Sequence, residues 1–141
     1  MYLLDTNVVS ELRKAGSGKA NKKVVDWAKS ISASSMYLSA ISILELEIGI
    51  LAKERKDMAQ GAILRAWLTT HVLPAFSGRI LPVDVAVAQC TARFHVPDRR
   101  SDRDAMIAAT AMTHGMTVVT RNVSDFEKTS VALINPWEGG Q

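Results

Sequence analysis

The sequence has 141 residues, of which 48% are hydrophobic and 22% are charged, and its formal net charge is +3. This length suits one globular domain with a full hydrophobic core, so we expect residues 1–141 to form a single domain. No run of about 18 apolar residues occurs, which excludes a membrane-spanning helix. The single cysteine, Cys90, excludes an internal disulfide framework, and Asp5 comes too early for a secretory signal, so we expect a cytoplasmic protein.

The chain begins with a short apolar run, residues 2–4, that ends in Asp5. Apolar residues follow at helical spacing from Val8, which predicts a strand and then a helix. In open α/β sheets, ligands bind just beyond the carboxyl ends of the strands, so Asp5 would face such a crevice. The alternative is that Asp5 only caps the helix, because Asp is a favoured N-cap residue.

Short strands and helices then alternate to the end of the chain, without repeats or a linker. This order predicts a three-layer α/β/α domain with a central parallel sheet of four or five strands and helices on both faces. An exposed loop is expected at 14–23. Further strands are expected at 36–39, 79–83, 116–120 and 131–134, and further helices from 24, from about 41, and over 62–76, 85–94 and 102–114.

The helix that starts near residue 41 is apolar on most of its sides, so it is either deeply buried or shared with a partner chain. Glu45 leans toward the face that we expect to be buried, and Glu47 is expected to point outward. That face carries Ile41, Leu44, Ile48 and Leu51, while Ile43, Leu46 and Ile50 make the rest a plausible partner surface. The alternative role of Glu45 is a capping box with Ser42.

Three further acids lie at the ends of predicted elements. Asp84 follows the third strand and is expected to cap the helix over 85–94. Asp104 opens the helix that ends before Gly115, and a capping box with Ser101 is its alternative role. Asp125 lies in the loop that follows the fourth strand.

Four of these acids are predicted to converge at one edge of the sheet: Asp5, Glu45, Asp104 and Asp125. Like charges in one site raise one another's pKa, and a divalent cation would offset this repulsion. Carboxylate oxygens without clustered His or Cys suit Mg²⁺, or Mn²⁺, rather than Zn²⁺. Such a site can bind a phosphodiester and activate a water molecule, and the weakly basic net charge is compatible with a nucleic acid substrate.

Several motifs, in this order along nearly the whole chain, resemble the PIN-domain ribonucleases, the toxins of VapBC-type toxin–antitoxin pairs, and above all the FitB-like members. The motifs are Leu3-Leu4-Asp5-Thr6-Asn7, Leu38-Ser39-Ala40-Ile41 running to Glu45-Leu46 and Gly49, Arg79-Ile80-Leu81-Pro82-Val83-Asp84, Asp104 before Ile107-Ala108-Ala109-Thr110-Ala111, Thr120-Arg121-Asn122 with Asp125-Phe126, and Asn135-Pro136-Trp137. Each motif alone is weak, whereas their combination is specific.

The resemblance implies roles for individual residues. Asp5, Glu45 and Asp104 would form the acidic metal site, with Asp104 rather than Asp102 selected because the family acid directly precedes the small-x-Ile-Ala-Ala run. The fourth acidic position falls on Asn122 or on Asp125, and we favour Asp125 because a neutral amide is a weaker ligand. Side chains expected to orient the acids, water or metal are Thr6, Asn7, Thr120 and Asn122.

The resemblance also implies the activity and the partners. The protein would be the toxin of a type II toxin–antitoxin system, a Mg²⁺-dependent endoribonuclease that hydrolyses RNA phosphodiester bonds. Four arginines near the acids in sequence are candidates for binding RNA phosphates, although for each one alone the role of an ordinary surface residue is the more common: Arg99, Arg100, Arg103 and Arg121. The expected partners are a second copy in a homodimer, a small cognate antitoxin, and promoter DNA bound through that antitoxin.

Two other functions compete with this one. The first is a degenerate, non-catalytic PIN module that acts only within an antitoxin–DNA complex. The second is a haloacid-dehalogenase-like phosphatase, which also begins with a strand followed by Asp. That family needs a second Asp two residues later, and this chain has Asn7 there.

Overall fold

A parallel five-stranded sheet forms the centre of the protein, which we describe from a computed structural model over residues 1–138. The strand order is β3-β2-β1-β4-β5, and every neighbouring pair is parallel. The strands are β1 (Tyr2–Leu4), β2 (Met36–Ser39), β3 (Ile80–Leu81), β4 (Thr117–Val119) and β5 (Leu133–Ile134). The first strand therefore lies in the middle of the sheet, between β2 and β4.

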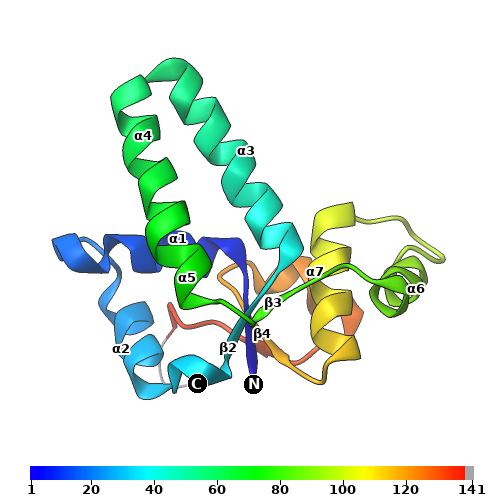
Figure 1. Cartoon of the computed structure of the whole chain (residues 1–141). Helices are drawn as coiled ribbons and strands as arrows, with labels where there is room; N and C mark the ends of the chain where they lie inside the picture. The colour runs from blue at the N-terminus through cyan, green and yellow to red at the C-terminus, as the bar shows by residue number, and fades with distance from the viewer. Residues whose placement is uncertain (139–141) are drawn as a thin grey trace.

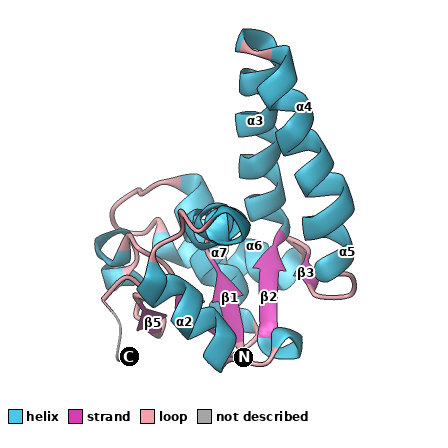
Figure 2. Cartoon of the chain, turned by 90° about the vertical axis from the view of Figure 1, so that its left-hand side faces the viewer, coloured by secondary structure: helices cyan, strands magenta, loops and turns pink. Residues whose placement is uncertain are grey.

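The helices surround this sheet, as Figures 1 and 2 show. They are α1 (Thr6–Arg13), α2 (Lys22–Ser30), α3 (Ala40–Lys56), α4 (Met58–Trp67), α5 (Leu73–Ala75), α6 (Val85–Phe94) and α7 (Asp102–Thr113). A π-helical segment, Leu68–Val72, joins α4 to α5, and short 3-10 turns occupy Lys14–Ser17, Ala33–Ser35, Val123–Asp125 and Glu127–Thr129. None of the helices within residues 1–138 is long and apolar enough to cross a membrane.

The two faces of the sheet carry two separate apolar cores, because successive strand residues point to opposite sides. On one face, Leu4 and Val119 pack with residues of α1, α2 and α3. On the other face, Leu3 and Val118 pack with residues of α7 such as Ile107. The helix α6 lies outside α7 and packs against it. The predicted three-layer α/β/α architecture is thus confirmed.

Most element bounds agree with the sequence-based prediction, and the differences fall at strand ends and in one helix. The strands β3, β4 and β5 are shorter than expected by two or three residues, because only Ile80–Leu81, Thr117–Val119 and Leu133–Ile134 pair with a neighbouring strand. The helix predicted from residue 62 already begins at Met58, where Asp57 caps it by accepting a hydrogen bond from Gln60 N at 3.1 Å. Helix α7 ends, as expected, before Gly115, whose φ is +66°.

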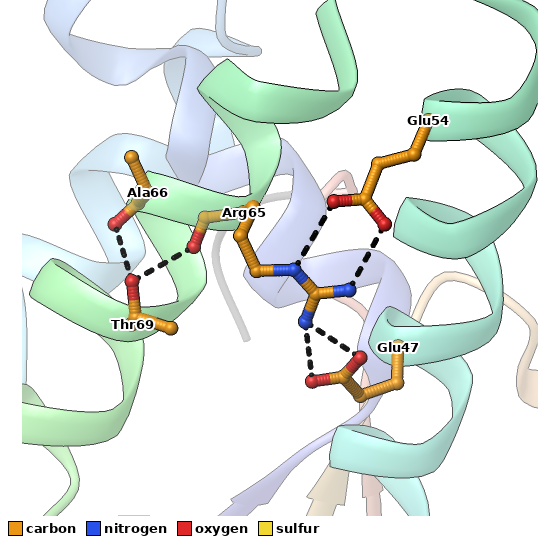
Figure 3. Close-up of polar contacts among 5 residues, drawn as sticks. All are labelled: Glu47, Glu54, Arg65, Ala66 and Thr69. Atoms are coloured by element: carbon orange, nitrogen blue, oxygen red, sulfur yellow. Dashed lines mark hydrogen bonds and ion pairs between the residues drawn. The ribbon is translucent and has the colours of Figure 1, made fainter. Parts of the chain in front are cut away.

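Helices α3 and α4 form an antiparallel arm that projects from the body of the molecule (Figure 1). They approach closely at Gly61, where a Cβ atom would lie 2.5 Å from the Cα of Glu54. Arg65 of α4 binds two acids of α3, with Nη1 at 2.7 Å from Glu47 Oε2 and Nη2 at 3.2 Å from Glu54 Oε1 (Figure 3). Glu47, expected to point outward, is therefore half-exposed and bound to Arg65.

The buried side of α3 differs from the predicted one. Leu46 and Ile50 are buried in the core, whereas Leu44, Ile48 and Leu51 are 45%, 48% and 58% exposed. The prediction failed because both sides of the helix are apolar, so periodicity alone does not select the side that faces the sheet. Contacts with α1 and α4, which the spacing does not reveal, make that selection.

Candidate active site at the carboxyl edge of the sheet

Asp5 lies directly after the central strand, and its carboxylate is held by bonds on both oxygens. Its Oδ1 accepts a hydrogen bond from Thr6 N at 2.8 Å, and its Oδ2 accepts one from Thr120 Oγ1 at 2.7 Å. The backbone N–H of Asp5 donates to Val119 O at 2.9 Å, which ties the residue to β4. Asp5 is thus the N-cap of α1, and it is also a carboxylate fixed at the sheet edge, so its two sequence-based roles coexist.

Asp5 is only 6% exposed, so its charge is costly. Burial raises the pKa of the Asp5 carboxyl, and the nearby charges of Glu45 and Asp125 add to the rise. The bonds from Thr120 and Thr6 act in the opposite direction, because they stabilise the ionised form.

Glu45 is connected to Asp5 through a single residue, Thr6. The hydroxyl of Thr6 donates to Glu45 Oε1 at 2.6 Å, which fixes the carboxylate against the start of α1. The capping-box role predicted for Glu45 is wrong, because the N-cap of α3 is Ser39, whose hydroxyl accepts from Ile41 N at 3.0 Å. Glu45 is therefore not used to cap its own helix.

Asp104 lies in the first turn of α7, where Ser101 is the N-cap and accepts a hydrogen bond from Asp104 N at 3.4 Å. The predicted N-cap at Ser101 is therefore present. It bonds to the backbone N–H of Asp104 and not to its carboxylate. Burial raises the pKa of that carboxyl to about 6, and the negative charges of Asp125, Asp5 and Glu45 contribute in that order. The predicted convergence of the four acids is visible in these mutual effects.

Asp125 and Asn122, the two candidates for the fourth acidic position, both lie in the segment after β4. Asp125, at the end of the turn Val123–Asp125, raises the pKa of both Asp5 and Asp104. Asn122 contacts Thr120 through its backbone N–H, which donates to Thr120 Oγ1 at 3.0 Å. These effects favour Asp125, and its role in holding a metal stays a prediction.

Asn7 links the acids to the loop after β4. Its Nδ2 lies 3.4 Å from both Asp5 Oδ2 and Thr120 Oγ1, and its Oδ1 accepts from Arg121 N at 3.3 Å. Thr6, Asn7 and Thr120 together form the hydrogen-bonded frame around Asp5. This frame gives Asn7 a structural role at the position where a phosphatase of the competing family would need a second Asp.

The donor set of the site suits a hard cation. The negative charges of Glu45 and Asp125 act on Asp5 and Asp104, and the one cation paired with these acids within residues 1–138 is Arg103, with its Nε 3.8 Å from Glu45 Oε2. Within residues 1–138, no three His, Cys, Asp or Glu side chains are close enough to hold one metal ion by themselves. A cation would need water or substrate oxygens to complete its coordination, as is usual for Mg²⁺.

The four candidate arginines have different surroundings. Arg103 approaches Glu45, and Arg121 lies over the ring of Trp137, with its Cζ 5.3 Å from the ring centroid. Arg100 donates from Nε to Phe94 O at 2.8 Å, which commits it to the loop between α6 and α7. Arg99 is exposed on that loop.

Asp84 caps α6, as expected, by accepting a hydrogen bond from Val87 N at 3.0 Å.

One feature of the site was missed by the sequence-based prediction. A cavity of about 490 Å³ begins at Thr6 and Asn7 and extends past Lys14 to Arg121 and Trp137. Lys14 had been placed in a solvent-exposed loop, and Trp137 had been noted only as part of a terminal motif. Neither periodicity nor spacing indicates that these two segments meet beside Asp5.

Comparisons with known proteins agree with this geometry. The family model described as PIN domain matches residues 2–131. The chain is 38% identical to VapC ribonuclease Y4jK of Sinorhizobium fredii, covering 98% of this chain and 99% of that protein. It is also 38% identical to Toxin FitB of Neisseria gonorrhoeae, with 97% and 99% covered. The solved structure of FitAB bound to IR36 DNA fragment superposes with a TM-score of 0.80 at 36% identity, covering 97% of this chain and 96% of that one.

Proposed function

The chain belongs to the PIN-domain family, and from this we propose that it is the toxin of a type II toxin–antitoxin pair, a single-domain Mg²⁺-dependent endoribonuclease. Relatives named as a VapC ribonuclease and a FitB toxin match it over nearly their whole lengths, which supports both parts of the proposal. Family membership also sets aside the phosphatase alternative.

One observation carries the proposal: the negative charges of Glu45 and Asp125 raise the pKa of Asp5 and Asp104, which come from two other segments of the chain, at a single edge of the sheet. A fold selected only for stability has no use for such repulsion, and perturbed acids of this kind gather at functional sites. The same observation argues against a degenerate module, in which the acids would be free to change.

The residues of the chain divide the work at the site. We assign Asp5 and Asp104 to hold the cation, with Glu45 and Asp125 completing the site directly or through water. A bound Mg²⁺ would lower the pKa of a water molecule bound to it and would offset the negative charge of the phosphodiester. Glu45 is oriented by the Thr6 hydroxyl through Oε1, and we assign its Oε2, which lies 3.8 Å from Arg103 Nε, to accept a hydrogen bond from an attacking water.

The supporting residues act through these acids. Thr120 and Asn7 hold Asp5 in place, and Asn122 positions Thr120. Arg103, beside Glu45, is assigned to bind an RNA phosphate. We infer that the protein works in the cytoplasm as a homodimer with a small antitoxin and that the pair binds promoter DNA through the antitoxin, since the FitAB structure pairs a similar chain with DNA.

The test is the Asp104→Asn variant, which keeps size and shape but removes the charge. We expect Mg²⁺-dependent cleavage of single-stranded RNA to fall at least about 100-fold, because a cation ligand is lost. Chelation with EDTA should abolish cleavage by the unmodified protein, and added Mg²⁺ should restore it.

The matched control is Asp84→Asn. Asp84 also follows a strand and caps a helix, and Asn caps as well as Asp, so activity should remain unchanged. Full activity of Asp104→Asn, or an equal loss in Asp84→Asn, would contradict the proposed site.

A further inference from the structure

A groove with an aromatic and cationic lining begins at Thr6 and Asn7, the two residues that follow Asp5. Its lining includes Arg13, Lys14, Arg121 and Trp137, with Glu11 as the one acid, and Glu11 Oε1 is paired with Lys14 Nζ at 3.0 Å. A volume of about 490 Å³ lies in the range of sites that hold small organic ligands such as one nucleotide. The groove therefore has the size and the charge to accept part of a nucleic acid chain.

The groove is joined to the acid site by one residue. Asn7 contacts Asp5 with its Nδ2 and accepts from Arg121 N with its Oδ1, so the acid and the cationic wall are separated by a single amide. Thr6, which binds Glu45, also lines the groove. A strand whose phosphate lies at the acids would therefore place an adjacent nucleotide here.

The aromatic and cationic side of the groove contains two neighbouring flat groups, the Arg121 guanidinium and the Trp137 ring. The Arg121 guanidinium lies over the Trp137 ring with its Cζ 5.3 Å from the ring centroid, and Arg121 is exposed to solvent. Trp137 is held by its backbone N–H, which donates to Asn135 Oδ1 at 3.0 Å, and by packing against the core. Because Arg121 is exposed, its guanidinium is accessible from the solvent side of this pair.

We propose that this groove binds the single-stranded RNA segment next to the scissile phosphate, with one base stacked on the Arg121–Trp137 pair and a phosphate bound by Lys14. Aromatic rings and guanidinium planes are the usual stacking surfaces for unpaired bases. In a duplex both faces of a base are already stacked, so the groove selects single strands. The inference rests on the proposed nuclease function and adds a specificity-determining subsite to it.

The test measures RNA binding apart from cleavage, in the Asp104→Asn background with EDTA. The probe is a short fluorescein-labelled single-stranded oligoribonucleotide, and its duplex with the complementary strand is the second probe. Trp137→Ala should weaken single-strand binding by about 5- to 100-fold, which is the loss expected for one stacked base. Arg121→Lys keeps the charge but loses the plane, so it should also bind more weakly than the parent.

Two controls separate stacking from folding and from net charge. Trp137→Phe retains a ring and should keep most of the affinity, whereas a variant that had merely unfolded would not. Arg55→Ala removes one exposed charge at the end of α3, far along the chain from the groove, and should leave binding nearly unchanged. Duplex binding should be weak and insensitive to Trp137.

The outcomes decide the groove and the nuclease separately. Unchanged single-strand binding by Trp137→Ala, equal losses in Arg55→Ala, or duplex binding as tight as single-strand binding would overturn the groove, even if Asp104 proves essential for cleavage. Trp137-dependent binding without any cleavage by the unmodified protein would keep the groove and remove the nuclease.

Discussion

Two groups of carboxylates in this protein are built in opposite ways. In the arm, Glu47 and Glu54 share Arg65, whose guanidinium contacts both at hydrogen-bond distance (Figure 3), and these acids raise the pKa of Arg65. At the sheet edge, the cation paired with the acids is Arg103, 3.8 Å from Glu45, and burial and the neighbouring acids raise the pKa of Asp5 and Asp104. One group joins two helices, and the other is left with an unbalanced negative charge.

The comparison teaches how to separate structural acids from functional ones. Glu47 and Glu54 lie on one helix, whereas the acids at the sheet edge come from separate segments, but both groups include partly buried side chains, so burial alone does not distinguish them. The two groups differ in whether a cation contacts the acids at hydrogen-bond distance. Such a cation stabilises the ionised form of an acid, whereas a cluster of acids without one lowers the free energy of unfolding. The predictions below test the two sides of this contrast.

The largest effect on stability is expected from Gly61→Ala in the arm. The new Cβ would lie 2.5 Å from Glu54 Cα, which would push α3 and α4 apart, so we expect a loss of about 2 kcal/mol in the free energy of unfolding. Denaturant melts measure it. Gly49→Ala is the matched control, since a Cβ there meets nothing within 4 Å and should stabilise α3 by up to about 1 kcal/mol.

A smaller effect of opposite sign is expected from Asp104→Asn in protein without added metal. The folded-state pKa of about 6 exceeds the ordinary 3.8, so the folded state binds the proton more tightly, and stability falls as pH rises from about 4 to 6. Above pH 6, the variant should therefore be more stable than the parent by about 1 kcal/mol, a value discounted because the carboxyl is only half-buried.

Thermal melts at several pH values, compared between the two proteins, measure this difference. Below pH 4 the two should melt alike, and added Mg²⁺ should stabilise the parent but not the variant, because a ligand stabilises only the state that binds it. A variant that is less stable than the parent at pH 7.5 would show that Asp104 is a structural acid like Glu47.

The smallest effect is expected from Arg65→Lys. An ammonium cannot contact both acids as the planar guanidinium does, so the arm should be slightly destabilised, and by less than in Gly61→Ala. Melting temperatures at low and high salt measure this, and the difference from the parent should shrink in high salt because the pairs are half-exposed. RNA cleavage should be unaffected, and a large loss of it would link the arm to the acid site.

Much of the fold was predictable because local signals agree with the tertiary structure. The strand at 36–39 and the helix at 85–94 were placed at their observed bounds, since apolar runs ending in Ser39 and Asp84 mark both a strand end and a helix cap. The acids were found by the same logic, because parallel strands bring their carboxyl ends to one edge. The choice of Asp104 over Asp102 came from family resemblance.

The rest depended on contacts that local patterns do not encode. The side of α3 that faces the core is set by its contacts with helices α1 and α4. The groove brings Lys14 together with Arg121 and Trp137, which both lie more than a hundred residues later in the sequence. Ser42 and Glu45 have the spacing of a capping box, but the N-cap of α3 is Ser39, which lies three residues earlier at the end of β2.

The strand order has a consequence for how the protein is made. The first strand to leave the ribosome is the central one, and one of its two neighbours, β4, is synthesised only after residue 116. Asp5 cannot be anchored by Val119 and Thr120, nor can it meet Asp125, until most of the chain has emerged. A chain that lacks β4 and the loop after it therefore cannot assemble the carboxylate site, even though β1 and Asp5 are present.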